Sequence, residues 1–437
     1  MDYQLQRQKH TPMRTNIICI ILLLSAANLG MAQQVNKGKQ GRFLITNATI
    51  HTVTNGIING DILIDGSTIV NVGEDLNDDS AIVIDGTDRR VYPGFIDSGC
   101  KVGLAEIGAV SLTQDHNELG TFTPHMEALT AVNPSSVHIP ITRVNGVTTA
   151  FTVPGGGLFP GKGALIHMYG YTPESMSAGF QGHILSWPSS GRKHRWDKRS
   201  DDDIKKDQEK AQKKLNDFWQ SVSAYAKMDN PDGYKPQLST LSEVANGKAK
   251  LLVEVNKKED ILNAIKWVND KEINAIFTGV AEGWRVADSL AKYDIPVITG
   301  PILDNPSRDS DRYDAPYTNA GKMQKAGVLV AIRTNESDNV RNLPFNAAFA
   351  ANYGLGLEEA IKAITINPAK IFGVDDQIGS IETGKLANFF ICDGDPFEMK
   401  TRISHVFING FNIPVESRQT YLYDEFLDRD SGTKIKD

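Results

Sequence analysis

Residues 91–97 read Val-Tyr-Pro-Gly-Phe-Ile-Asp, a mostly apolar stretch interrupted by one Pro-Gly pair. It follows residues 41–91, where short β-type runs alternate with turn residues and Asp65-Gly66 is a hairpin signal. A second series of short β runs occupies residues 379–410, near the other end of the chain. Residues 91–97 therefore mark the change from a β-rich end to a centre with a different pattern.

In the centre of the chain, apolar strand-like runs alternate with helical or irregular segments. The predicted strands are residues 91–96, 148–153, 250–255, 275–278, 296–299 and 328–332, and the predicted helices are residues 260–269, 281–292 and 357–366. Near-continuous apolar strands are typical of parallel sheets that are buried on both faces. The alternation therefore predicts an α/β fold built from parallel βα units.

Four stretches carry a resemblance to a known family. Val91–Asp97 resembles the first barrel strand of the amidohydrolase superfamily, residues 363–373 its last barrel helix, and residues 379–389 its return into a β-domain. Together with residues 339–344, they are similar to imidazolonepropionase-like members. The resemblance implies a TIM-type (β/α)8 barrel at residues 92–372 and a small β-sandwich domain from both chain ends, residues 41–91 and 373–415.

The family resemblance implies a metal-dependent hydrolase of C–N bonds, with zinc as the expected metal. Two His residues on the first strand hold that metal, because side chains at i and i+2 of a strand point the same way. The positions of this chain that match the metal ligands of the family are Gly99, Lys101, Glu254, Gly279 and Asn335.

These five residues do not make a zinc site. Glycine has no side chain, an ammonium has no lone pair to donate, and a carboxamide does not accept a proton at neutral pH. Glu254 is then the single plausible ligand, whereas catalytic zinc usually has three protein ligands. We therefore predict Lys101, Glu254 and Asn335 as the candidate site residues, with no metal ligand among them and no cofactor.

Three interpretations follow. In the first, the chain is an enzyme without a metal, in which Lys101 and Glu254 are acid–base groups; the alternative for these two residues is an ion pair that merely replaces the metal charge without catalysing a reaction. Alternatively, a metal site has moved elsewhere, or the protein binds a ligand without any chemistry. The residues suited to a moved site are Asp115, His116, Glu118, His125 and His167.

The first 32 residues have the layout of a signal peptide. Arg7, Lys9 and Arg14 precede an apolar run from Ile17 to Ala27, and small residues stand before a cleavage point after Ala32. The apolar run is about half of the roughly 20 residues that span a bilayer, which favours a signal peptide over an anchor. We therefore predict an exported protein, periplasmic or secreted.

The net charge narrows the classes of molecule that the protein is expected to bind. The formal net charge is -7, so nucleic acid and anionic membranes are disfavoured, and a small-molecule substrate or ligand is predicted. A second copy of the chain or an active paralogue stays open as a partner.

The charge-dense residues 192–214 predict a solvated helix starting near Asp201. Cys100 and Cys392 are predicted to be buried and unpaired.

Overall fold

A computed structural model describes residues 37–191, 198–228 and 233–429. The predicted signal peptide, residues 1–32, and the first part of the charge-dense segment, residues 192–197, lie outside the described residues. Within the described ranges, no helix has both the length and the apolar character needed to cross a membrane.

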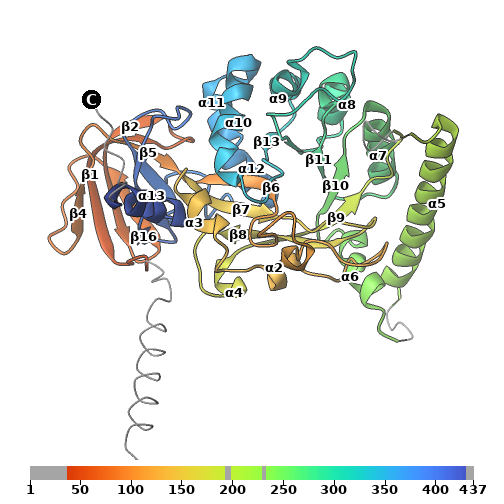
Figure 1. The fold of residues 1–437 in the computed structure, drawn as a ribbon, viewed down its shortest axis with the longest axis horizontal. Coiled ribbons are helices and arrows are strands. Elements are labelled where there is room, and N and C mark those ends of the chain that lie inside the picture. Colours follow the sequence, from red (N-terminus) through yellow and green to blue (C-terminus); the bar gives the residue numbers. More distant parts are fainter. Residues whose placement is uncertain (1–36, 192–197, 229–232, 430–437) are drawn as a thin grey trace, which may run out of the picture. The chain divides into compact units, whose positions relative to one another are not determined.

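Eight strands form the barrel sheet in chain order, β6 to β13 (Figure 1). Their bounds are β6 Phe95–Cys100, β7 Val147–Thr152, β8 Gly161–His167, β9 Ser177–Ser186, β10 Leu251–Val255, β11 Ala275–Gly279, β12 Val297–Thr299 and β13 Val330–Ile332. The backbone connects the last strand to the first. The amide of Asn335 donates to the Gly99 carbonyl at 2.9 Å, and the amide of Lys101 donates to the Glu336 carbonyl at 2.8 Å. The predicted TIM-type barrel is confirmed.

One barrel strand runs against the others. β8 pairs antiparallel with both β7 and β9, whereas the neighbouring pairs from β9 to β13 and the pair β6–β7 are parallel. The expectation of parallel βα units throughout is therefore wrong at this position. As a result, the carboxyl end of β8 lies at the opposite end of the barrel from the carboxyl ends of its neighbours.

Helices follow most of the barrel strands, and α7, α8 and α9 lie beside β10–β13 (Figure 1). α5 begins at Asp201, as the sequence predicted, and its few buried residues include Leu215 and Trp219. The predicted helix over residues 357–366 is instead two helices, α11 and α12. The bounds are α2 Ala128–Ala131, α3 His138–Arg143, α4 Pro173–Met176, α5 Asp201–Ala226, α6 Pro236–Ala245, α7 Lys258–Asp270, α8 Ala287–Lys292, α9 Ala315–Lys325, α10 Leu343–Ala350, α11 Leu357–Lys362, α12 Ile366–Phe372 and α13 Arg418–Asp428.

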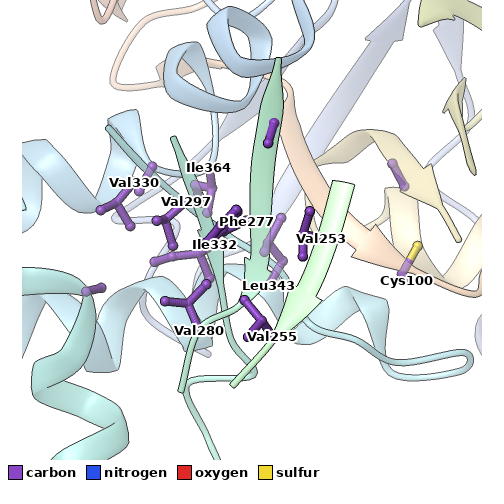
Figure 2. Close-up of a cluster of buried hydrophobic side chains, with 14 of the residues drawn as sticks. Cys100, Val253, Val255, Phe277, Val280, Val297, Val330, Ile332, Leu343 and Ile364 are labelled. Carbon is purple, nitrogen blue, oxygen red and sulfur yellow. The ribbon is translucent and has the colours of Figure 1, made fainter. Parts of the chain in front are cut away.

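The barrel core has two layers that follow the period of two along each strand. One buried side chain from each of the eight strands meets in a single inner cluster: Ile96, Phe151, Leu165, Ile184, Leu252, Ile276, Ile298 and Ala331. Alternate residues on the same strands, such as Val253 and Phe277, belong to a second cluster with helix residues such as Leu343 (Figure 2). The inner face of each strand is thus identified by one residue, and its i+2 neighbour points the same way.

The two chain ends form a second sheet. Its strands are β1 Arg42–His51, β2 Ile57–Asp65, β3 Thr68–Gly73, β4 Ile82–Asp85, β5 Arg90–Pro93, β14 Phe389–Cys392, β15 Ile403–Ile408 and β16 Phe411–Ile413. β5 and β14 pair antiparallel, with Pro93 opposite Phe389, and thereby join the N-terminal and C-terminal strands. Cys100 and Cys392 are both free and buried, as predicted.

The predicted strand over residues 91–96 is in fact two strands in different sheets. β5 ends at Pro93 and β6 begins at Phe95, so the chain changes sheets at Gly94. A Cβ atom at Gly94 would lie within 3 Å of three Thr148 side-chain atoms. Glycine is therefore required where the chain passes between the two sheets.

Candidate functional site

The candidate site lies at the carboxyl ends of strands β10, β11 and β13. Leu252, Ile276 and Ala331 face the inside of the barrel. The residues two positions further along, Glu254, Thr278 and Arg333, follow on the same face. Strand alternation thus brings these three polar side chains together at the barrel mouth.

Arg333 and Glu254 form a bidentate ion pair. The two terminal nitrogens of the guanidinium donate to Oε2 and Oε1 of Glu254 at 2.7 and 2.8 Å. Oε2 also accepts a hydrogen bond from the Thr278 hydroxyl at 2.7 Å, and Oε1 accepts one from the Asn256 amide at 3.4 Å. A carboxylate has about four acceptor positions, so these contacts leave Glu254 with none free.

The ion pair fixes Glu254 in its charged form. Burial alone would raise the pKa of Glu254, but the charge and hydrogen bonds of Arg333, helped by Thr278, lower the pKa to about 2. A carboxylate with this pKa is a weak proton acceptor near neutral pH, because a general base works best when its pKa lies near the working pH. Glu254 is therefore a structural anion, and the prediction that it serves as a base finds no support in this geometry.

Two glycines make room for the ion pair. A Cβ atom at Gly99 would lie 2.9 Å from Cδ of Arg333, and one at Gly279 would lie 2.7 Å from Oε1 of Glu254. The side chain of Arg333 is 7% exposed, and its Nε donates to the Gly300 carbonyl at 3.2 Å. The space into which longer side chains at positions 99 and 279 would project is thus filled by Arg333, Glu254 and the neighbouring Asn256.

A polar cavity of about 730 Å³ opens above the ion pair. Besides Glu254 and Arg333, its walls include the side chains of Asn256, Lys257, Trp284, Asp304, Asn305, Ser307, Asp311, Asn319 and Asn335. The volume lies within the range of about 300–1,000 Å³ that is typical of small-molecule sites. The cavity therefore has the size of a ligand site, and its lining is more polar than is usual for such sites.

Of the three predicted site residues, Glu254 and Asn335 line this cavity and Lys101 does not. Asn335 has a φ of 57°, a conformation in which asparagine is enriched. The side-chain amide of Asn335 is exposed and makes no hydrogen bond to the described residues. The partner of Glu254 is Arg333 rather than Lys101, so the predicted Lys101–Glu254 pair is wrong. Arg333 was overlooked, although its i+2 spacing from Ala331 places it on the inner face.

The residues suggested for a moved metal site do not gather. His167 ends β8 and pairs with Thr149 near the start of β7, so it lies at the far end of the barrel. Its ring nitrogen Nδ1 is 3.3 Å from the amide of Asn388, and burial lowers the pKa of His167 to about 4. Nδ1 of His116 and of His125 is buried with no hydrogen-bond partner in the described part of the chain. Neither nitrogen belongs to a described group of three potential ligands.

The loop between β12 and α9 forms one wall of the cavity and is held by ion pairs. Arg308 donates from Nε and Nη2 to the Glu282 carboxylate at 2.5 and 2.6 Å, and Arg285 pairs with Asp311. Burial raises the pKa of Glu282, but the hydrogen bonds and charge of Arg308 outweigh burial and lower it. These contacts fix the loop against the ends of β10 and β11 and give the cavity a defined shape.

The donor set at the barrel mouth does not fit a divalent metal. In the described ranges, no three His, Cys, Asp or Glu side chains lie close enough together to hold a metal ion. Glu254 has no free acceptor position, and the nearest charged group is a guanidinium, which repels a cation. The zinc that the family resemblance implies therefore has no matching set of ligands here.

Comparisons with known proteins agree with this fold. A sequence profile described as the Amidohydrolase family matches residues 296–413. An imidazolonepropionase from Picrophilus torridus is 35% identical over 109 residues, 23% of this chain and 28% of that protein. A 5-methylthioadenosine/S-adenosylhomocysteine deaminase from Thermoanaerobacter pseudethanolicus is 26% identical over 373 residues, 77% of this chain and 81% of that protein.

A solved structure is also similar to this chain. The crystal structure of an amidohydrolase from Thermotoga maritima has a TM-score of 0.75 and 26% sequence identity, and the match covers 85% of this chain and 99% of that one. The matched share of this chain is larger than the barrel residues 95–372 alone. The chain is therefore similar in sequence and in fold to members of the amidohydrolase superfamily, and imidazolonepropionases are among the proteins that it matches.

Proposed function

We propose that this chain is a small-molecule-binding protein built on the amidohydrolase scaffold, in which the usual metal ligands are lost and metal-dependent hydrolysis of C–N bonds no longer operates. The observation that carries the proposal is the cavity of about 730 Å³ at the barrel mouth. In it the carboxamide of Asn335 is exposed and has no partner among the described residues. Pockets of this size with a few convergent polar groups are the usual ligand sites of proteins.

The residues around the cavity support binding better than catalysis. The described residues that line it include neither His nor Cys, the commonest proton-transfer and nucleophilic groups of enzymes. The pKa of Glu254 is about 2, so this carboxylate is a poor base at neutral pH. Positions 99, 101, 279 and 335 carry Gly, Lys, Gly and Asn, none of which supplies a good metal ligand.

Hydrolysis of a C–N bond without a metal is the second candidate. This candidate is favoured by the similarity of the chain to a protein named as a deaminase, a similarity that covers 81% of that protein's length. Under this candidate the ion pair would polarise the ligand and water would attack unaided by a metal. The two candidates differ in one measurable respect, because only the second one consumes its ligand.

A binding and turnover experiment separates the candidates. The purified protein is screened by thermal shift against cyclic amides and dipeptides, and small molecules released from it by denaturation are identified by mass spectrometry. For any compound that binds, Asn335→Ala should weaken the affinity about five- to thirtyfold, since about 1–2 kcal/mol is lost with one hydrogen bond. Asn71→Ala, an exposed change on β3, is the control and should bind normally.

The outcomes of this experiment are distinct. Binding with no product after long incubation supports the proposed function. Turnover above a protein-free blank establishes the second candidate instead. If no compound copurifies and none of the screened compounds shifts the melting temperature, the proposal fails.

We also propose that residues 1–32 direct export of the chain. The proposal rests on the basic start, the short apolar run and the small residues before Ala32. Expression of the full chain in a Gram-negative host should yield a protein in the periplasmic or medium fraction whose N-terminus is Gln33. A chain that stays in the cytoplasm with residues 1–32 intact would contradict export.

A further inference from the structure

Four positions that match the metal ligands of the family lie around the ion pair of Arg333 and Glu254. Gly99 faces the aliphatic part of Arg333, Arg333 binds Glu254 with two hydrogen bonds, and Gly279 faces the carboxylate of Glu254. The fourth position, Asn335, is two residues after Arg333, and its amide donates to the Gly99 carbonyl at 2.9 Å. Gly99 and Glu254 thus contact Arg333 directly, and Gly279 and Asn335 lie one contact further away.

We infer that Arg333 is a built-in cation that has replaced the metal at the mouth of the barrel. This inference rests on the proposed loss of the metal ligands and goes further. Arg333 itself blocks metal binding, both by filling the space over Gly99 and by occupying the carboxylate of Glu254. The missing ligands are thus only part of the reason why the site cannot hold a metal.

The charge of the ion pair supports this role. Arg333 is 93% buried, and a buried guanidinium is tolerated only when it is paired, which Glu254 and the Gly300 carbonyl provide. A guanidinium has five N–H donors, of which two bind Glu254 and one binds Gly300. Two donors remain in a residue that lines the cavity. They can bind an oxygen atom of the ligand, as a metal ion would.

The inference predicts that a metal site can be rebuilt only if Arg333 is removed. Gly99→His and Asn335→Asp restore two ligands beside Glu254, which gives the three that zinc usually needs. With Arg333 still present, this double variant should contain little zinc after growth with zinc and dialysis. The triple variant that adds Arg333→Ala should contain about one zinc per chain, and zinc should raise its melting temperature.

Two controls test whether zinc binding depends on the removal of Arg333 and on the carboxylate of Glu254. A triple variant with Arg341→Ala in place of Arg333→Ala removes a barrel arginine that does not line the cavity, and it should stay free of zinc. Adding Glu254→Gln to the Arg333→Ala triple variant should abolish zinc binding, because zinc and Arg333 compete for the same carboxylate. Metal is measured by inductively coupled plasma mass spectrometry, and folding is checked by circular dichroism.

The results distinguish this inference from the proposed function. Zinc in the double variant, or no zinc in a folded Arg333→Ala triple variant, would overturn the role of Arg333 and leave the proposed function intact. One tightly bound zinc per chain in the unaltered protein would overturn both. This last measurement needs no variant, so the inference remains testable even if the triple variant does not fold.

Discussion

Glu254→Gln is expected to lower the free energy of unfolding by about 3 kcal/mol, the lower end of the roughly 3–5 kcal/mol range for breaking a buried ion pair. The change leaves the guanidinium of Arg333, 7% exposed, without its counter-charge. The lower end applies because the Glu254 side chain is 33% exposed, so water partly replaces the lost contact. Urea denaturation at pH 7 measures the effect.

Two comparisons test the cause of this loss. The double variant Glu254→Leu/Arg333→Met should recover most of the lost stability, because apolar residues of similar volume replace buried ion pairs at little cost. Glu358→Gln removes an exposed ion pair with Lys362 and should change stability by less than about 1 kcal/mol. Equal losses for Glu254→Gln and Glu358→Gln would show that burial of Arg333 does not matter.

Asp97 is expected to make the protein less stable as the pH rises from about 4 to 7. The residue lies on β6 and accepts hydrogen bonds from the amides of Gly99 and Thr334 and from the Thr334 hydroxyl, at 2.5 to 3.3 Å. Burial raises the pKa of Asp97 to about 7, although these hydrogen bonds and the charge of Arg333 oppose the shift. The unfolded chain releases the same proton near pH 3.9.

The sign of this pH dependence follows from the number of protons that the folded and unfolded states bind. Between the two pKa values the folded state holds a proton that the unfolded state has lost, so raising the pH favours unfolding. Three pKa units correspond to about 4 kcal/mol, fully present below pH 4 and lost above pH 7. The free energy of unfolding should therefore fall between pH 4.5 and 7.5 in the unaltered protein and stay flatter in Asp97→Asn. Parallel pH profiles for the two proteins would contradict this prediction.

The sequence predicted most of the barrel because its strands are apolar and buried on both sides. The last four strands, β10 to β13, agree with the predicted runs to within two residues. β8 and β9 were missed because glycine interrupts their apolar pattern. At Gly182 on β9, a Cβ atom would lie 2.3 Å from Cδ1 of Leu252, so close packing requires glycine there. The same glycine interrupts the apolar pattern by which a strand is predicted.

The candidate site was predicted only in part. Resemblance to the family located Glu254 and Asn335, which both line the cavity. The partner of Glu254 could not be found from local spacing, because Arg333 is 79 residues away and Lys101 carries the same charge. Choosing between two cations requires knowing which side chain faces inward, and for Arg333 that depends on the register of β13.

The pairing of β5 with β14 sets an order of events during synthesis. Phe389 leaves the ribosome 296 residues after Pro93, its partner in the register. At about 5–20 residues per second this takes roughly 15–60 seconds, during which the edge of β5 has no neighbour on that side. The sheet formed by the two chain ends is therefore completed only when almost the whole chain has emerged. Such a delay would suit the proposed export, in which the chain is threaded through a translocation channel before it folds.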